Sequence, residues 1–262
     1  MMTDALKIGV IGGSGWLGRA IIQGMLDAGI TSPEQITLSY RSRRPLGFLG
    51  VHRTQDNHEL VRRSDVIIVS VRPIDWPVVR VAADGKLVIS VMAGIRLNEL
   101  AHQLQTRRVV RAMPNAAAEV GKSHTPWVAS ADVSAQDRSI VCRILDGCGI
   151  ADEVASEADI DYLTGLSGSG LAFPALLATA MIKDAVAHGI ESDVARRAAS
   201  AILIGAGRLL ELHAQDPEET IKEFVEYRGV IASAIIEMRA AGFDRAVRAG
   251  LAAALQRTKN MG

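Results

Sequence analysis

The sequence is short of cysteine, of aromatic residues and of excess charge of either sign. Its 262 residues include two cysteines, Cys142 and Cys148, which have neither CxxC spacing nor a histidine cluster beside them. This usage is typical of reduced thiols in a cytoplasmic protein and argues against a disulfide framework. The chain also lacks a nucleophile with its base and a convincing pair of carboxylates. We therefore expect no hydrolytic chemistry and no metal site.

The charges balance, because lysine plus arginine and aspartate plus glutamate each number 29. A balanced chain offers no general surface for nucleic acid or for an anionic membrane. Aromatic residues make up 4% of the chain, which also argues against a platform for base stacking. We expect no nucleic-acid partner.

The N-terminus lacks the cationic region and the cleavage site of a secretory signal, and Lys7–Ile11 is a short strand-like run instead. One stretch, Tyr162–Ile182, contains no charged residue and is long enough to span a bilayer. Several glycines and serines and Pro174 interrupt it. We therefore predict a glycine-rich loop followed by a buried helix, and no membrane partner.

Hydrophobic residues, by contrast, make up 48% of the chain, which is enough for a substantial core. The first half alternates short apolar runs with helical patterns such as Leu17–Ala28 and Asn98–Gln105. Near-continuous runs of valine and isoleucine suit strands that are buried on both faces. This alternation predicts an α/β fold with a parallel, doubly wound sheet. The predicted strands are Leu6–Ile11, Ile36–Tyr40, Val66–Val71, Leu87–Val91, Val109–Ala112 and Pro126–Ala129.

From about Asp159 onward the second half shows no pattern typical of a strand, and its apolar residues recur at helical spacing. We therefore predict two domains, residues 1–155 and an all-helical domain over residues 156–262. A helical unit of about a hundred residues struggles to bury so much apolar surface alone, which favours a homodimer or higher homo-oligomer. The alternative is a compact monomeric bundle. The predicted helices are Leu171–His188, Ser192–Ala214, Pro217–Val225, Ile231–Ala241 and Phe243–Met261.

A glycine-rich turn joins the first strand to the first helix, and its segment Gly13–Gly18 fits the pattern G-x-G-x-x-G. We expect Gly13 to permit the tight turn, Gly15 to let the backbone approach a pyrophosphate, and Gly18 to bring the helix close to the sheet. The free N–H groups at the helix start would bind the phosphates. The alternative is a tight glycine turn without a ligand. The predicted cofactor-binding residues here are Gly13, Ser14, Gly15, Trp16 and Leu17.

The end of the second strand lacks the acidic residue that binds the ribose 2′-OH in many NAD sites. It carries Arg41, Ser42 and Arg43 instead, in the stretch "SYRSRRP". An arginine pairs with a 2′-phosphate in bidentate fashion, whereas a carboxylate would repel it. The sequence therefore favours NADP(H), NADPH in the reducing direction. The alternative is a solvated basic loop, to which Arg44 in particular is suited.

Five motifs follow one another along the chain, and two of them, Arg-x-Met-Pro-Asn and Ser-Gly-Ser-Gly, are specific in their order and spacing. Through them the chain resembles the pyrroline-5-carboxylate reductase family, which reduces a cyclic imino acid to proline with NAD(P)H, over nearly its full length. The motifs are "IGVIGGSGWLGRAII" (Ile8–Ile22), "DVIIVSVRP" (Asp65–Pro73), "VISVMAGI" (Val88–Ile95), "VVRAMPNAAAEVG" (Val109–Gly121) and "LTGLSGSGLAF" (Leu163–Phe173).

The resemblance implies an N-terminal Rossmann domain and a C-terminal helical domain that interlocks with its partner in a dimer. It implies an oxidoreductase that transfers hydride from the nicotinamide C4 to a C=N carbon of a small imino-acid substrate. By position it also assigns cofactor contacts to turns that follow the strands and to one residue near the adenosine end. These residues are Asn57, Val71, Arg72, Pro73, Ala93, Gly94, Met113, Pro114 and Asn115.

Several positions depart from the family pattern. The cofactor turn is one residue longer, and Arg72 replaces the usual lysine. Ala116 and Ala117 stand in place of Thr-Pro, and Leu171 stands in place of a proline after Ser-Gly-Ser-Gly. The helix after the second strand looks much shortened.

The largest departure concerns the residues that imply substrate binding. The family carries a Ser-Pro-Gly-Gly-x-Thr loop for the substrate carboxylate. The segment Tyr227–Ala232 stands in its place and lacks the serine and threonine hydroxyls of that loop. Arg228 has the fork geometry to bind a carboxylate, and Tyr227 has a ring to stack and a hydroxyl to donate. The alternatives are a salt bridge to a nearby glutamate and a packing aromatic. The Ser-Gly-Ser-Gly turn supplies N–H groups for an anion or forms a tight helix entry. The candidate catalytic residues are Tyr227, Arg228 and Ser169.

Three hypotheses remain open at this point. The first is NADPH-dependent reduction of 1-pyrroline-5-carboxylate to L-proline, in proline biosynthesis. The second is a related NADP-dependent reductase for another imine or carbonyl compound that bears a carboxylate. The third is a non-catalytic NADP-binding relative. Hydride transfer to an iminium requires mainly orientation and a dry pocket, so it tolerates the loss of a hydroxyl.

Overall fold

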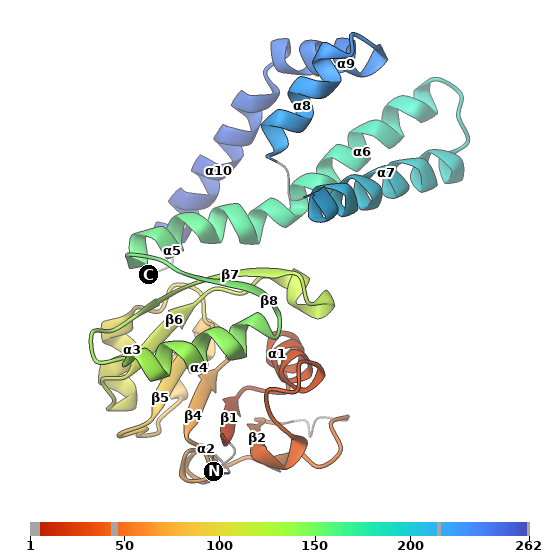
Figure 1. Ribbon diagram of the computed structural model, residues 1–262. Helices are drawn as coiled ribbons and strands as arrows, with labels where there is room; N and C mark the ends of the chain where they lie inside the picture. The colour runs from red at the N-terminus through yellow and green to blue at the C-terminus, as the bar shows by residue number, and fades with distance from the viewer. Residues whose placement is uncertain (1–5, 43–46, 214–215, 261–262) are drawn as a thin grey trace. The chain divides into compact units, whose positions relative to one another are not determined.

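The computed structural model describes residues 6–42, 47–213 and 216–260 of the chain (Figure 1). These residues form two compact units. The first unit contains the chain up to Gly168 together with the C-terminal stretch from Ala254, and the second contains Ser169–Ala253.

The first unit is built on an eight-stranded sheet with the order β3-β2-β1-β4-β5-β6-β7-β8. Neighbouring strands are parallel except at β6 and β7, which pair antiparallel. The chain runs outward from β1 to β3 and then returns to β4 on the other side of β1. This reversal is the topological switch point at which open α/β sheets bind ligands. The strands are β1 (Ile8–Ile11), β2 (Ile36–Ser39), β3 (His52–Thr54), β4 (Val66–Val69), β5 (Leu87–Ser90), β6 (Val109–Ala112), β7 (Ser123–Ala129) and β8 (Gly149–Glu153).

Both faces of the sheet are buried, and the alternation of side chains along each strand assigns them to two cores. In β4, Val66 and Ile68 belong to one core, whereas Ile67 and Val69 belong to the other. Helices α1 and α4 supply the first core, and α2, η2 and α3 supply the second. The helical segments of this unit are α1 (Trp16–Asp27), η1 (Pro33–Gln35), α2 (Asn57–Arg62), η2 (Pro73–Val78), α3 (Leu97–Leu104), η3 (Ala116–Val120), α4 (Ala135–Asp146), α5 (Glu157–Leu163) and the π-turn η4 (Thr164–Gly168).

The predicted α/β class and the predicted strands are confirmed, and the described residues after Asp159 contain helices and no strand. Two strands were missed, β3 and β8. β3 has three residues, and every residue of β8 is exposed or half-buried. Neither strand therefore contains the apolar run that is typical of a buried strand. The predicted strand at Pro126–Ala129 begins earlier, at Ser123, because β7 pairs along its length with β8.

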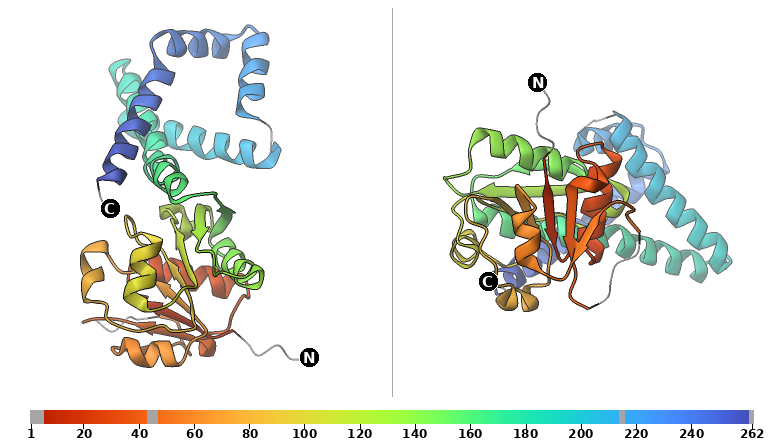
Figure 2. Two further views of the ribbon diagram at one scale, coloured as in Figure 1. Left: turned by 90° about the vertical axis from the view of Figure 1, so that its left-hand side faces the viewer. Right: turned by 90° about the horizontal axis from the view of Figure 1, so that it is seen from below.

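The second unit consists of helices that leave most of their apolar side chains exposed. In the part of Ser169–Ala253 that the structure describes, the buried residues are three alanines, Ala195, Ala199 and Ala232. Figure 2 shows the ribbons of these helices from two further sides. They are η5 (Ser169–Leu171), α6 (Ala172–Ala187), α7 (Ser192–His213), α8 (Pro217–Glu226), α9 (Val230–Ala240) and α10 (Phe243–Lys259), whose last turns belong to the first unit.

The predicted glycine-rich loop and buried helix around residues 162–182 are wrong for the single chain. The glycines and serines form helical turns, η4 and η5, and none of the residues of α6 is buried. Within the described residues, one continuous helical stretch, Glu157–Ala187, has the length and composition to cross a membrane: 31 residues, with 6% of its most apolar window buried. Helices that face another subunit have the same composition, so length and hydropathy alone do not identify a membrane span.

Candidate cofactor site and substrate loop

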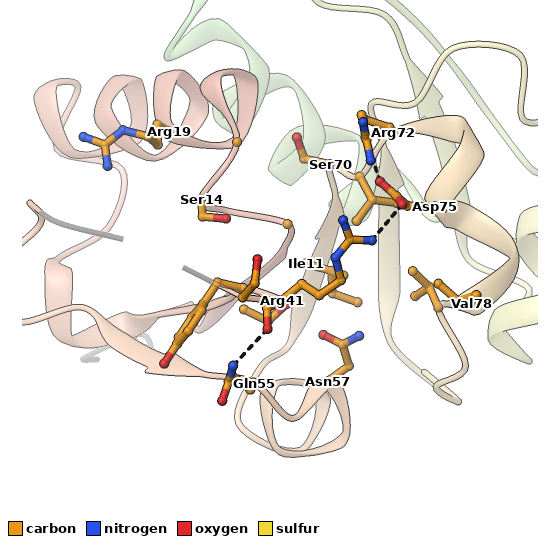
Figure 3. A pocket seen from close by; sticks show the side chains of 17 residues that line it. Ile11, Ser14, Arg19, Arg41, Gln55, Asn57, Ser70, Arg72, Asp75 and Val78 are labelled. Carbon is orange, nitrogen blue, oxygen red and sulfur yellow. Dashed lines mark hydrogen bonds and ion pairs between the residues drawn. The ribbon is translucent and has the colours of Figure 1, made fainter. Parts of the chain in front are cut away.

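The carboxyl ends of β1, β2 and β4 meet at one edge of the sheet because these strands are parallel and adjacent. A cavity of about 860 Å³ lies at this edge (Figure 3). Its volume is in the range typical of small-molecule sites. The residues that line it come from the turn after β1, the segment from β2 to Ser42, the start of α2, and the segment after β4.

Gly12 is the left-handed residue of the glycine-rich turn, with φ +78°, and the predicted Gly13 follows it within the same turn. A Cβ on Gly12 would lie 2.6 Å from the carbonyl oxygen of Ser70, so glycine is required there for both conformation and space. Gly13 also has a packing role, because its Cβ would lie 2.9 Å from the Cβ of Leu38 on β2. The expected tight turn is therefore present, and it contains both glycines.

Gly18 has the role predicted for it. A Cβ at this position would lie 2.9 Å from the Cα of Gly13, so the absent side chain allows α1 to pack against the turn. Gly15 is the N-cap of α1 and forms no side-chain cap, and the first turn contains no acidic residue. The N–H groups at this end are thus available to an anion, which is the donor set that a dinucleotide pyrophosphate requires.

Arginines surround the other end of the cavity. Arg41 Nη1 and Asp75 Oδ1 are 2.8 Å apart, and Arg72 Nε donates to Asp75 Oδ2 at 2.7 Å. Hydrogen bonds from Arg72 and then from Arg41 hold the pKa of Asp75 below its usual value. Gln55 Nε2 donates to the backbone carbonyl of Arg41 at 2.9 Å and so fixes the main chain at the end of β2.

The cavity brings together part of the predicted cofactor set. Trp16 and Leu17 do not line it; Trp16 is 53% exposed, and Leu17 packs on the first core. Arg43 lies outside the described residues. Of the other predicted residues, Ser14, Gly15, Arg41, Ser42, Asn57, Val71 and Arg72 line the cavity, and Gly13 and Pro73 flank it in sequence.

The remaining predicted cofactor residues follow β5 and β6. Ala93 and Gly94 form a turn after β5, with Gly94 at φ +79°, and Met113–Asn115 follows β6. These strands are parallel to β4, so both segments lie at the same edge of the sheet, although they do not line the cavity. Their contact with a cofactor stays a prediction.

Sequence reasoning did not predict several residues of this cavity as cofactor contacts, although two of them, Arg19 and Ser70, lie within the quoted motifs. They include Arg19, Ser39, Gln55, Ser70, Asp75 and Val78. A sequence signal existed for Asp75, because it stands three residues after Arg72 in the turn that follows a strand. Nothing in the sequence showed that Arg41, which follows β2, would bind the same carboxylate of Asp75 as Arg72 does.

Asn115 holds two motifs together. Its side chain is buried, accepts from the N–H of Ala117 at 2.9 Å and donates to the carbonyl of Ser167 at 3.0 Å. The Met-Pro-Asn segment and the first serine of the Ser-Gly-Ser-Gly turn are therefore linked directly. Asn115 thus has a structural role in the described chain that the predicted cofactor role does not include.

A buried ion network fixes α5 on the sheet. Arg111, inside β6, is 1% exposed and pairs with Asp161 at 2.8 Å and with Glu157 at 3.2 Å. Arg96 binds the other oxygen of Asp161 at 2.8 Å. Breaking such a buried pair leaves an uncompensated charge, so the network sets the start of the helical stretch that leads into the Ser-Gly-Ser-Gly turn.

The predicted substrate residues all lie in the second unit. Ser169 begins it and is exposed, and Tyr227 is 86% exposed between α8 and α9. Arg228 has φ +53° and its N–H donates to the carbonyl of Val225 at 3.1 Å, so it ends α8 in the left-handed conformation that glycine usually adopts. Proline cannot take this conformation, because its ring fixes φ near −65°. The main chain here therefore differs from a loop that has proline at this position.

Among the residues that the structure describes, no group of three or more His, Cys, Asp or Glu side chains is arranged to hold a metal ion. The polar groups of the cavity are arginines, one carboxylate, hydroxyls and amides.

Comparison with known proteins gives the family. A pyrroline-5-carboxylate reductase from Methanosarcina acetivorans is 32% identical over 266 residues, which cover 98% of each chain. The chain belongs to the pyrroline-5-carboxylate reductase family. Residues 157–261 match the family described as pyrroline-5-carboxylate reductase dimerisation, and residues 7–94 match the one described as NADP oxidoreductase, coenzyme F420-dependent.

Solved structures agree with this assignment. A pyrroline-5-carboxylate reductase from Coxiella burnetii is 27% identical and matches with a TM-score of 0.88 over 99% of each chain. A pyrroline carboxylate reductase from Plasmodium falciparum with NADP bound is 24% identical and shares the fold, with a TM-score of 0.82 over 98% of each chain.

These comparisons confirm four predictions: the pyrroline-5-carboxylate reductase family, the Rossmann fold with a helical dimerisation domain, the NAD(P)H-dependent oxidoreductase class and NADP as the cofactor. The match to a dimerisation family supports a homo-oligomer. The domain limits at 155 and 156 and the individual site residues stay predictions.

Proposed function

We propose that this protein reduces 1-pyrroline-5-carboxylate to L-proline with NADPH, as a step of proline biosynthesis. The observation that carries the proposal is the full-length similarity to reductases of this name, 32% identical over 98% of both chains in the Methanosarcina case. The glycine-rich turn and the arginine-rich end of the cavity support it, because they suit a pyrophosphate and a 2′-phosphate respectively.

The chain's own contribution to the reaction is binding and orientation. A bound NADPH supplies hydride, and a protonated cyclic imine already has an electrophilic carbon, so a strong general acid is not required. We assign the pyrophosphate to the N–H groups at the start of α1 and the 2′-phosphate to Arg41 and Ser42. The turns at Ala93–Gly94 and Met113–Asn115 are assigned to the nicotinamide end. Holding the two reactants in one geometry removes much of the entropic barrier.

The substrate carboxylate is assigned to Arg228, with Tyr227 and Ser169 beside the substrate. Guanidinium is suited to this task because it binds a carboxylate with two parallel hydrogen bonds. Tyr227 and Arg228 are both exposed within their own unit, so neither side chain is buried there.

The test is NADPH oxidation at 340 nm by the purified protein with 1-pyrroline-5-carboxylate, and proline analysis of the product. Efficient turnover with proline as the product is expected. If the protein binds NADPH but leaves this substrate unchanged, the proposed substrate is wrong while the cofactor assignment stands.

A second candidate is reduction of another imine or carbonyl compound that bears a carboxylate. The backbone at Arg228 favours it, because a left-handed residue there excludes the family's Ser-Pro-Gly-Gly-x-Thr loop, and the hydroxyls of that loop are absent. A panel of five- and six-membered cyclic imino acids separates the candidates by kcat/KM. The variant Arg228→Ala should raise KM for the preferred substrate and leave the affinity for NADPH unchanged; an unchanged KM would remove Arg228 as the anchor.

We further propose that the protein works as a homodimer in the cytoplasm and that α6 and its neighbours face a second copy rather than lipid. The two free cysteines, the balanced charge and the exposed apolar helices of the second unit support this assignment. Light scattering of detergent-free protein tests it, and a monomeric mass at micromolar concentration would contradict it.

A further inference from the structure

The cavity contains a carboxylate that no motif marks. Asp75 is the acidic residue among the described residues that line this cavity, together with Arg19, Arg41 and Arg72. Figure 3 shows Arg41 reaching across the cavity to Asp75. The ion pair therefore joins the end of β2 to η2, the segment that follows β4.

Asp75 is held from its own side of the cavity. Arg72 precedes it by three residues and donates to Oδ2 at 2.7 Å, so this pair forms within one turn. Arg41 reaches Oδ1 at 2.8 Å from the segment that follows β2, and its side chain is 71% exposed. The hydrogen bonds from both arginines lower the pKa of Asp75, so its carboxylate carries its charge at neutral pH. Asp75 is thus a fixed anion, and Arg41 is the partner with room to move.

The 2′-phosphate that distinguishes NADP(H) from NAD(H) would meet this pair. A phosphate dianion requires the same guanidinium that Asp75 occupies, and a neighbouring carboxylate repels it. A ribose with a free 2′-OH carries no such charge and is insensitive to this competition.

We propose that Asp75 is a specificity-determining residue that competes with the cofactor 2′-phosphate for Arg41 and thereby limits the preference for NADP(H) over NAD(H). The inference rests on the proposed use of NADP(H) in this cavity. It assigns opposite effects to residues in direct contact: Arg41 strengthens binding of the 2′-phosphate, and Asp75 weakens it.

The test uses two adenosine fragments, 2′,5′-ADP and 5′-AMP, which differ by the 2′-phosphate alone. Isothermal titration calorimetry of the cofactor-free protein gives both affinities without any turnover. The variant Asp75→Asn keeps the size of the side chain and an acceptor for Arg72. It should bind 2′,5′-ADP about tenfold more tightly and 5′-AMP with nearly unchanged affinity, since one charge near a dianion is worth about this factor. Its affinity for 2′,5′-ADP should also fall more steeply with salt.

Two further variants separate the competition from a general charge effect. Asp132→Asn removes the same charge at an exposed pair with Arg107, outside the cavity, and should leave both affinities unchanged. In an Arg41→Ala background, the gain from Asp75→Asn should shrink, because the contested guanidinium is gone. Thermal unfolding of each cofactor-free variant checks that the fold is kept.

Three results would overturn the inference. An unchanged ratio of the two affinities in Asp75→Asn shows that Asp75 does not compete. A selective loss of 2′,5′-ADP affinity shows that Asp75 orients Arg41 for the phosphate instead. Wild-type protein that binds neither 2′,5′-ADP nor NADPH would remove both this inference and the proposed cofactor. Protein that binds them but does not reduce 1-pyrroline-5-carboxylate would remove the proposed substrate alone.

Discussion

The two units of this chain treat apolar side chains in opposite ways. The first unit buries them on both faces of its sheet, where Ile8, Ile36 and Ile67 have no exposed surface. The second unit exposes them: Leu176 is 71% exposed and Ile204 68%. The first unit buries its core within a single chain, whereas the second unit exposes apolar surface to solvent. The difference indicates that the helical unit reaches its final packing only against another copy, as the dimerisation family predicts.

The largest expected effect is on the self-association of the helical unit. Replacing Ile204→Asp places a charge on the apolar surface of α7 and should weaken self-association by about a thousandfold, because truncation or charging of an interface centre is costly. Analytical ultracentrifugation measures the shift from dimer to monomer. Leu49→Asp is the matched control, since Leu49 is 92% exposed in the first unit. A variant at Ile204 with the wild-type mass would place the interface elsewhere.

The next test concerns the contribution of the buried ion network to the stability of the first unit. Arg111→Met leaves the carboxylates of Asp161 and Glu157 without their buried partner and should lower the free energy of unfolding by about 3 kcal/mol. Arg107→Met removes an arginine that is 83% exposed and pairs with Asp132. It should cost less than about 1 kcal/mol. Urea unfolding followed by circular dichroism measures both, and equal losses would show that burial of the pair is unimportant.

The glycine-rich turn provides a test of space against conformation. Gly12→Ala combines a positive φ with a Cβ 2.6 Å from the carbonyl oxygen of Ser70. It should cost about 2 kcal/mol and weaken NADPH binding. Gly29→Ala has a positive φ of +64° but meets nothing within 4 Å. It should cost about 1 kcal/mol without any effect on the cofactor. NADPH affinity that is equal in both variants would contradict the assigned role of the turn.

The smallest effect is a pH dependence of the first core. Burial raises the pKa of Cys148 to about 11 from the ordinary 9.0. The folded state therefore favours the protonated thiol, and the resulting stability is complete below pH 9 and is lost as the pH rises toward 11. Between pH 8 and pH 10, the wild type should lose about 1 kcal/mol more than Cys148→Ala in urea unfolding. Parallel losses would show that this thiol ionises equally in both states.

Much of the candidate site followed from local sequence. The strand that ends at Ile11 and the glycines after it are neighbours in the chain, so one motif describes them. The missing acid after β2 was likewise visible in a few consecutive residues. Asp75 could not be assigned in this way, because its partner Arg41 lies far away in the chain, in the segment after β2. Arg111 belongs to the Arg-x-Met-Pro-Asn motif, but its ion pairs could not be predicted, because the partners Glu157 and Asp161 lie on α5. The need for glycine at position 12 could not be predicted either, since the motif gives spacing and not φ.

The sequence by itself determined the family, the sheet, the helical second half and the class of cofactor, because each depends on periodicity or on residues close together in the chain. Tertiary structure decided which charges share one carboxylate, that Gly12 is the left-handed residue of the turn, and that Arg228 adopts a backbone that proline cannot. It also decided that α6 is exposed and not buried. Hydropathy reports how much apolar surface a helix has, whereas only the folded chain shows whether that surface is covered.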